Sequence, residues 1–209
     1  EQHEGFFKLP HVDVDKIPTE DFPLYSHWSY DRIYRNDMIK QPDVLMAMFL
    51  HEDSFSNDEL KANYEFYEPK YIHESSLSPS IHSILACRLG KEAESFEFFK
   101  FATRMDLDNY NRNTCEGLHT TSIVAAWMNI VYGFGGLTPS KGRISIAPMI
   151  PKTWKSYSFR ILAGEEVVRV KVDHEGVSLK TKTGKQAVLT VYGRETTVSG
   201  KETRISFSE

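Results

Sequence analysis

The stretch TTSIVAAWMNIVYGFGG, residues 120–136, decides the fold because the chain changes character where this stretch ends. Its dense apolar residues predict a core helix, and its terminal glycine pair can end that helix. The residues before it carry helical patterns, whereas the residues after it alternate apolar and polar side chains with a period of two, as strands do. We therefore expect an all-α part, residues 1–140, followed by a small antiparallel β-sandwich, residues 141–209.

Start and stop signals for individual helices support the helical assignment. Ser56 followed by Glu59 is the signature of a capping box. Ser78 and Pro79 suit the first positions of a helix, and Gly90 suits the residue that ends it. These signals predict well-bounded helices joined by short loops in the first part of the chain.

Composition limits the classes of protein to consider. Of the 209 residues, 40% are hydrophobic and 12% aromatic, which is enough for a packed core. The net charge of −4 does not indicate binding to nucleic acid or to a membrane surface. From residue 145 onward eleven Lys and Arg face seven Asp and Glu, which leaves a charge of −8 on the rest of the chain.

Cysteine usage and the lack of an apolar leader bear on location. Cys87 and Cys115 are interpreted as free thiols in a reducing compartment. The first residues, EQHEGFFKLP, are charged, and no run is apolar enough to span a bilayer. We expect a cytoplasmic protein, and a chain that does not begin with Met is expected to be a fragment.

Two polar clusters stand directly before helices in the first half of the chain. Lys40 and Gln41 could hold sugar hydroxyls or an anion close to the positive end of a helix. In YIHESSLSPS, the hydroxyls of Ser75 and Ser76 suit an oxyanion such as phosphate. For Lys40 and Gln41, the structural alternative is a solvated helix entry. For the serines it is capping of the following helix, which accounts for Ser78 but need not account for Ser75 and Ser76.

A further polar cluster, NTCEGLHTTS at residues 113–122, stands at the mouth of the apolar helix. Glu116 could act as a base or a positioning carboxylate, and Gly117 allows close backbone approach. His119 and Thr120 begin the helix, where donors converge on an anion, although a capped helix with a partly buried histidine is the structural alternative. The preceding loop, RMDLDNYNRNT, lacks the spacing of a calcium loop, so no metal site is expected.

Several motifs taken together resemble glycoside hydrolase family 65, most closely its disaccharide phosphorylases of the maltose phosphorylase type. They occur in the family's order and cover nearly the whole chain: IKQPDVL, ANYEFYEP, HESSLSPSIHSILA, TRMDLDNYNRNT and EGLHTTS followed by IVYGFGGL. The resemblance implies that residues 1–140 are the C-terminal part of an (α/α)6-barrel catalytic domain and that residues 141–209 are its C-terminal β-sandwich. It also implies a need for the missing N-terminal part, and we expect a homo-oligomer.

The resemblance further implies an inverting phosphorolysis. Phosphate would attack an α-glucosyl disaccharide such as maltose and give β-glucose 1-phosphate and glucose, while a carboxylic acid protonates the leaving oxygen. Inorganic phosphate is then the co-substrate, and no metal or organic cofactor is needed. The proton-donating Glu of the family and its Trp-Asp sugar motif have no counterpart in this chain. We therefore expect the chain alone to be inactive.

Individual roles follow from the residues that match the family's motifs. Lys40 and Gln41 match the pair that binds the transferred glucosyl unit. Two serines and the first residues of the apolar helix match the family's phosphate-binding residues. Glu116 matches a carboxylate that orients other groups. The four residues assigned to phosphate are Ser75, Ser76, His119 and Thr120.

Two other functions remain open. A hydrolase of the same family, acting on trehalose or kojibiose, would need a general base, for which Glu74 and Glu116 are the candidates. A non-catalytic carbohydrate-binding fragment would use aromatic side chains of the sandwich, such as Trp154, Tyr157 and Tyr192, although core packing also explains them.

Overall fold

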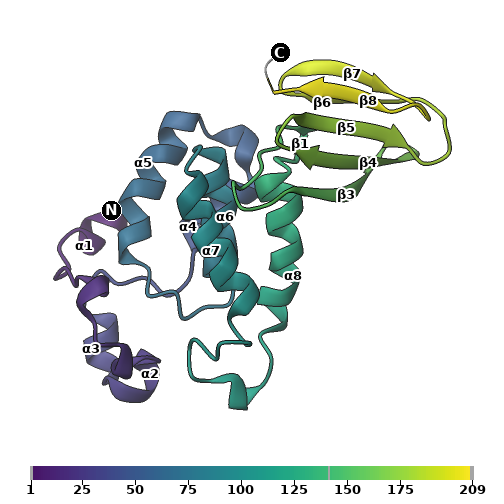
Figure 1. The fold of residues 1–209 in the computed structure, drawn as a ribbon. Coiled ribbons are helices and arrows are strands. Elements are labelled where there is room, and N and C mark those ends of the chain that lie inside the picture. Colours follow the sequence, from purple (N-terminus) through teal and green to yellow (C-terminus); the bar gives the residue numbers. More distant parts are fainter. Residues whose placement is uncertain (1, 141, 208–209) are drawn as a thin grey trace. The chain divides into compact units, whose positions relative to one another are not determined.

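A computed structural model describes residues 2–140 and 142–207, and it places helices first and strands second along the chain (Figure 1). The chain divides into two compact units. The first comprises residues 1–85 and 97–126, and the second comprises residues 86–96 and 127–209. The helices are α1 (Gln2–Phe6), α2 (Leu24–His27), α3 (Tyr30–Tyr34), α4 (Asp43–Leu50), α5 (Asn57–Tyr67), α6 (Ser78–Arg88), α7 (Glu92–Arg104) and α8 (Thr120–Met128).

Local sequence signals set the helix ends. The capping box predicted before α5 is confirmed, since Ser56 accepts from the backbone N–H of Glu59 and the Glu59 carboxylate accepts from that of Ser56. Gly90 follows α6 with a φ of +69°, which terminates the helix. None of the helices in the described residues is long and apolar enough to cross a membrane.

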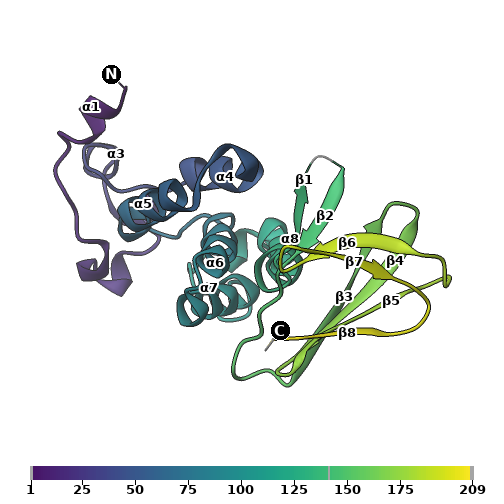
Figure 2. The same ribbon diagram turned by 90° about the horizontal axis from the view of Figure 1, so that it is seen from above.

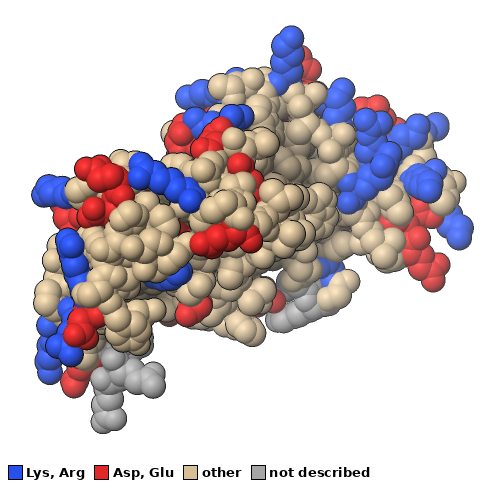
Figure 3. Space-filling model, turned by 90° about the horizontal axis from the view of Figure 1, so that it is seen from below, with Lys and Arg blue, Asp and Glu red and all other residues tan. Residues whose placement is uncertain are grey.

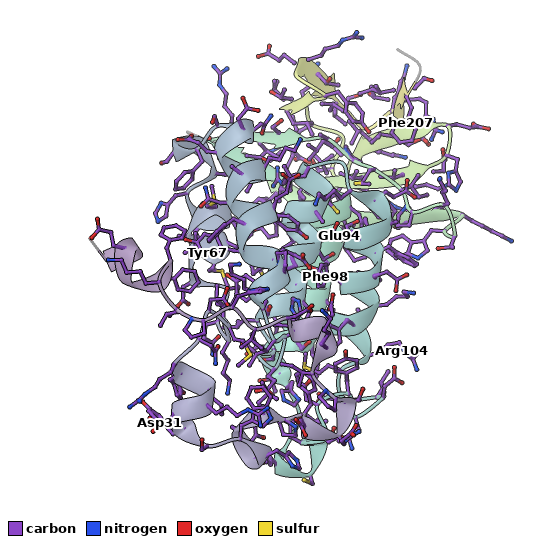
Figure 4. All side chains as sticks on the ribbon, turned by 90° about the vertical axis from the view of Figure 1, so that its left-hand side faces the viewer. Asp31, Tyr67, Glu94, Phe98, Arg104 and Phe207 are labelled. Atoms are coloured by element: carbon purple, nitrogen blue, oxygen red, sulfur yellow. The ribbon has the colours of Figure 1, made fainter. Side chains whose placement is uncertain are left out.

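The core of the helical unit is aromatic and contains two histidines, of which His82 is fully buried and His73 is half-buried. His73 and His82 lie with their ring centroids 4.9 Å apart, and Phe98 lies 5.1 Å from each. Phe98 comes from α7 and is labelled in Figure 4. Burial lowers the pKa of His73 to about 3, helped by the neighbouring His82, and burial lowers the pKa of His82 to about 4. Both side chains are therefore neutral core residues.

The apolar helix predicted for residues 120–136 changes from an α-helix to a π-helix along its length. After α8 the backbone widens into a π-helix, Asn129–Phe134, which the sequence does not predict. Gly135 follows the π-helix. The space around it is filled, since a Cβ at this position would lie 2.6 Å from the Phe159 ring. The Tyr157 hydroxyl donates to the carbonyls of Phe134 and Met149 at 2.6 and 2.8 Å and ties the strands to this turn.

The second unit contains two four-stranded sheets (Figure 2). Their orders are β1-β2-β6-β7 and β3-β4-β5-β8, and the β2–β6 pair is parallel, unlike the wholly antiparallel arrangement expected. The first strand was also not expected. The strands are β1 (Thr138–Ser140), β2 (Arg143–Ile146), β3 (Ser156–Ala163), β4 (Glu166–Asp173), β5 (Gly176–Thr181), β6 (Ala187–Val191), β7 (Arg194–Val198) and β8 (Thr203–Ser206).

Period-two alternation gives both sheets a buried face. Val168, Val170 and Val172 of β4 are fully buried, and the residues between them are exposed. Leu189 and Val191 of β6 belong to the same buried cluster, so one core receives side chains from both sheets.

Candidate functional site

Two segments far apart in sequence meet where sugar and phosphate contacts were predicted. Ile39 and Tyr71 form a parallel β-bridge, which aligns the segment before α4 with the segment before α6. Two residues beyond Ile39, the side chain of Gln41 accepts a 2.9 Å hydrogen bond from the hydroxyl of Ser75. Ser75 is buried and Ser76 is half-buried. The residue assigned to the glucosyl unit thus contacts a residue assigned to phosphate.

Tyr25 of α2 connects two further predicted residues. The ammonium of Lys40 lies 5.0 Å from the centroid of the Tyr25 ring, within the range of a cation–π interaction. The Tyr25 hydroxyl lies 3.4 Å from each carboxylate oxygen of Glu116 and donates to that carboxylate. Tyr25 therefore contacts Lys40 through its ring and Glu116 through its hydroxyl. Sequence reasoning missed Tyr25, because it lies outside the predicted polar clusters and 91 residues from Glu116.

Asp106 positions His119. The carboxylate accepts from ring nitrogen Nδ1 of His119 at 2.5 Å and from the His119 backbone N–H at 2.8 Å. The hydrogen bond from the ring lowers the pKa of Asp106 against the opposing effect of burial, so the carboxylate is ionised. With Nδ1 donating to Asp106, the other ring nitrogen of His119 is left for a ligand. The sequence suggested only a loop role for Asp106.

Glu74 accepts hydrogen bonds from other parts of the protein through both its carboxylate and its backbone carbonyl. The backbone N–H of Leu24 donates to its carboxylate, and the side chain of Asn111 donates to its carbonyl oxygen at 3.3 Å. Burial raises the pKa of Glu74, although the Leu24 hydrogen bond and the charge of Lys40 act in the opposite direction. This carboxyl holds the segment that carries Tyr25 against the segment that carries Ser75.

The other polar residues near Ser75 belong to the core. The hydroxyl of Ser78 lies 2.9 Å from Nδ1 of His73, and Ser78 is fully buried. Ser78 is also the first residue of α6 rather than the predicted N-cap. His73 has a φ of +50°, which turns its ring into the aromatic core. Neither residue is available to an anion, whereas Ser76 in the same stretch is partly exposed.

Residues at the N-terminal end of α8 are exposed to solvent. Thr120, its first residue, is exposed, as are Glu116 and Cys115. In the part of the chain that the structure describes, no hydrogen bond joins His119 or Thr120 to the pair formed by Gln41 and Ser75. Nor do three or more His, Cys, Asp or Glu side chains there form a group suited to a metal ion.

The aromatic residues considered for sugar stacking take part in packing. Trp154 lies 5.1 Å from Phe134 and 5.6 Å from Tyr157, measured between ring centroids. Tyr192 donates its hydroxyl to the carbonyl of Pro148. These contacts favour the packing interpretation for all three residues.

Both the helical part of the chain and the strand-containing part match domains of one family of carbohydrate-active enzymes. Residues 1–128 match the glycosyl hydrolase family 65 central catalytic domain, and residues 137–198 match the C-terminal domain of the same family. The chain belongs to glycoside hydrolase family 65.

Relatives within the family carry several names. The chain is 42% identical to maltose phosphorylase of Bacillus subtilis over 200 residues, which are 96% of this chain and 26% of that protein. It is 42% identical over 176 residues to an α,α-trehalose phosphorylase of Thermoanaerobacter brockii, covering 84% of this chain and 23% of that one. A solved structure from the human microbiome, provisionally assigned as a kojibiose phosphorylase, superposes with a TM-score of 0.91 at 53% identity, over 99% of this chain and 28% of that chain. The chain therefore spans about a quarter of the length of these relatives.

Proposed function

We propose that this chain is the C-terminal part of an inverting disaccharide phosphorylase, in which it supplies the phosphate side and part of the sugar side of the active site. The contact between Gln41 and Ser75 carries this proposal, because it places a group suited to sugar hydroxyls beside one suited to an oxyanion. Residues 1–140 would then be part of an (α/α)6 barrel and residues 141–209 a β-sandwich.

In the proposed reaction, Lys40 and Gln41 hold the glucosyl unit while phosphate attacks its anomeric carbon from the face opposite the leaving oxygen. Hydroxyl and imidazolium donors at the helix entries hold the phosphate, and Glu116 orients a sugar or a donor. The C1–O bond to phosphate forms as the glycosidic C1–O bond breaks, and the leaving oxygen takes a proton from a Glu on the preceding part of the polypeptide. No metal or organic cofactor takes part. The proposed phosphate ligands are Ser75, Ser76, His119 and Thr120.

Maltose is the substrate that we propose first. The similarity to the Bacillus subtilis maltose phosphorylase over 96% of this chain supports this choice, while relatives named for trehalose and kojibiose define the alternatives. Hydrolysis is less well supported. Glu74 already accepts from the Leu24 backbone, so it is poorly placed to activate water.

The test is a phosphate-dependence assay on the complete polypeptide. Maltose, trehalose and kojibiose are supplied separately, with and without phosphate, and both products and their anomeric form are measured. We expect phosphate-dependent release of β-glucose 1-phosphate, with maltose preferred, and no turnover by this chain alone. Glucose release at an equal rate without phosphate would contradict phosphorolysis and indicate a hydrolase.

A further inference from the structure

Two backbone hydrogen bonds tie residues 37–41, which lead into α4, to residues 70–75, which lead towards α6. The N–H of Ile39 donates to the carbonyl of Lys70 at 2.8 Å, and the N–H of Ile72 donates to the carbonyl of Ile39 at 3.0 Å. Together they make the parallel bridge described above. A single bridge is much shorter than an ordinary pair of strands, so its register depends on the contacts at its two ends.

Side chains connect the same two segments on both sides of this bridge. After the bridge, the hydroxyl of Ser75 donates to Gln41, which is the contact that carries the proposed function. Before the bridge, the ammonium of Lys70 lies 3.3 Å from a carboxylate oxygen of Asp37. Asp37 lies two residues before the bridge on one segment, and Lys70 lies one residue before it on the other. The ion pair and the predicted ligand residues are therefore joined through the bridge.

The carboxylate of Asp37 is buried and held by several donors. It accepts from ring nitrogen Nδ1 of His11 at 2.8 Å and from the backbone N–H of Val12 at 3.0 Å, in addition to pairing with Lys70. Burial alone would raise the pKa of Asp37, but the hydrogen bonds from His11, Val12 and Lys70 lower it overall. The ammonium of Lys70 also lies 4.8 Å from the centroid of the Phe66 ring. Both partners of the ion pair are thus fixed in place.

Burial distinguishes this ion pair from the charge pairs on the surface. In Figure 3, Lys and Arg side chains, in blue, lie beside Asp and Glu side chains, in red, at several places on the visible surface. The pair of Lys16 and Asp13 is of the exposed kind, with side chains that are 83% and 44% exposed, and water weakens such pairs. Lys70 and Asp37 are only 15% and 9% exposed. Removing the ammonium would leave a buried carboxylate without its cation, which is strongly unfavourable and would displace the segments.

We propose that Asp37 and Lys70 are positioning residues: their ion pair fixes the register of the bridge and thereby keeps Gln41 in contact with Ser75. The pair acts through the backbone of the two segments and not by touching a substrate. The inference rests on the proposed function for the roles of Gln41 and Ser75 in binding sugar and phosphate. The coupling between the ion pair and the bridge does not depend on which reaction is catalysed.

Amide hydrogen exchange of the complete polypeptide tests the coupling without any assay of activity. In Lys70→Met, we expect the amides of Ile39 and Ile72 to exchange roughly tenfold faster or more, relative to amides elsewhere in the protein. Lys70→Arg keeps the cation and should restore their protection. The matched control is Ser56→Ala, which breaks the capping box of α5 and so lowers stability without selectively exposing these two amides. If Lys70→Met does not fold, the milder Asp37→Asn replaces it and should show the same selective change.

Steady-state kinetics of the complete enzyme test the effect on the site. Lys70→Met should raise the KM for disaccharide and the KM for phosphate together, each roughly threefold or more, as for the loss of a modest hydrogen bond, and Ser56→Ala should change neither. In the Gln41→Ala background the same substitution should have little further effect, because the contact that it disturbs is already gone.

Two results would overturn the proposal: unchanged exchange at Ile39 and Ile72, or equal effects of Lys70→Met in the wild-type and Gln41→Ala backgrounds. A wild-type enzyme that cleaves the disaccharide without phosphate would instead overturn the proposed function. The exchange measurement would still decide the role of the ion pair in that case, so the two failures are distinguishable.

Discussion

Replacing Asp106 with Asn tests whether this carboxylate holds His119 in place. Asp106 accepts two hydrogen bonds from His119, at 2.5 Å from the ring and 2.8 Å from the backbone. The two side chains are 14% and 18% exposed, so water screens them only partly. Hydrogen bonds to charged groups contribute about 1.5–3 kcal/mol each, and Asn retains one acceptor, so we expect the free energy of unfolding to fall by about 1–2 kcal/mol.

Asp108→Asn is the matched control, two residues further on. Asp108 pairs with Arg104 at 2.6 Å, but these side chains are 47% and 57% exposed. Water competes with exposed ion pairs, so this substitution should cost clearly less than the change at Asp106. Urea unfolding of both variants and the wild type, at neutral pH and equal ionic strength, gives the two differences. Equal losses would refute the idea that Asp106 is a dedicated support for His119.

The pair of Asp106 and His119 also predicts that the free energy of unfolding depends on pH. The hydrogen bond from His119 lowers the pKa of Asp106 below its ordinary value. A carboxyl of this kind contributes stability that is complete above its unfolded pKa of about 3.9 and is lost as the pH falls through its folded pKa. The difference between wild type and Asp106→Asn should therefore be present at neutral pH and shrink in acid. A difference that stayed constant throughout would contradict this account.

Kinetic constants of the complete enzyme test the Asp106→Asn variant independently of its stability. If His119 binds phosphate, misplacing its ring should raise the KM for phosphate and leave the KM for the disaccharide nearly unchanged. Steady-state kinetics with each substrate varied in turn would show this. An equal rise in both KM values would indicate a general structural defect instead.

Three further predictions concern other parts of the chain. Tyr25→Phe removes only the hydroxyl that contacts Glu116, and in the complete enzyme we expect the KM for disaccharide to rise roughly threefold, as for one modest hydrogen bond. Gly136→Ala should lower the melting temperature far more than Gly164→Ala, because both residues have positive φ but only at Gly136 would a Cβ meet backbone, that of Ala147. Burial lowers the pKa of His82 to about 4, so its contribution to stability is complete above about pH 6.5 and declines towards pH 4; acid titration of unfolding should show a shallower slope in His82→Phe.

Features set by neighbours in sequence could be predicted without the structure. The capping box of Ser56 and Glu59 depends on residues three positions apart, and the helix-ending conformation of Gly90 depends on glycine itself. The strand pattern from Glu166 to Asp173 was also correct, because alternate burial needs only a period of two.

Features set by distant contacts could not be predicted. The π-helix at Asn129–Phe134 depends on packing around Gly135 and Phe159, which no local pattern records. The parallel pairing of β2 with β6 joins residues that are 45 positions apart in sequence, such as Ser145 and Thr190. Likewise, nothing in the spacing of the sequence distinguishes Asp106 from an ordinary turn residue before its contact with His119 is known.

Site prediction by residue type succeeds only where the environment is also inferred. His73 and His119 both lie in polar stretches that precede helices, and the sequence offers no physical reason to rank one above the other. Burial among aromatic rings lowers the pKa of His73, whereas Asp106 holds the His119 ring through Nδ1 and leaves its other nitrogen for a ligand. The difference between a core histidine and a candidate ligand is therefore tertiary.

The arrangement of carboxylates bears on the choice between phosphate and water as the nucleophile. An inverting hydrolase needs a free carboxylate near the attacking water, because water must lose a proton as it attacks. Glu74 is buried and accepts from the Leu24 backbone, and Glu116 accepts from Tyr25. The groups in contact with them are donors, the backbone N–H of Leu24 and the hydroxyl of Tyr25, and the charge of Lys40 acts on Glu74. Donors and a cation suit a nucleophile that arrives already negatively charged. Phosphate is such a nucleophile and requires no base, so the engagement of both carboxylates in other hydrogen bonds supports the proposal of phosphorolysis over that of hydrolysis.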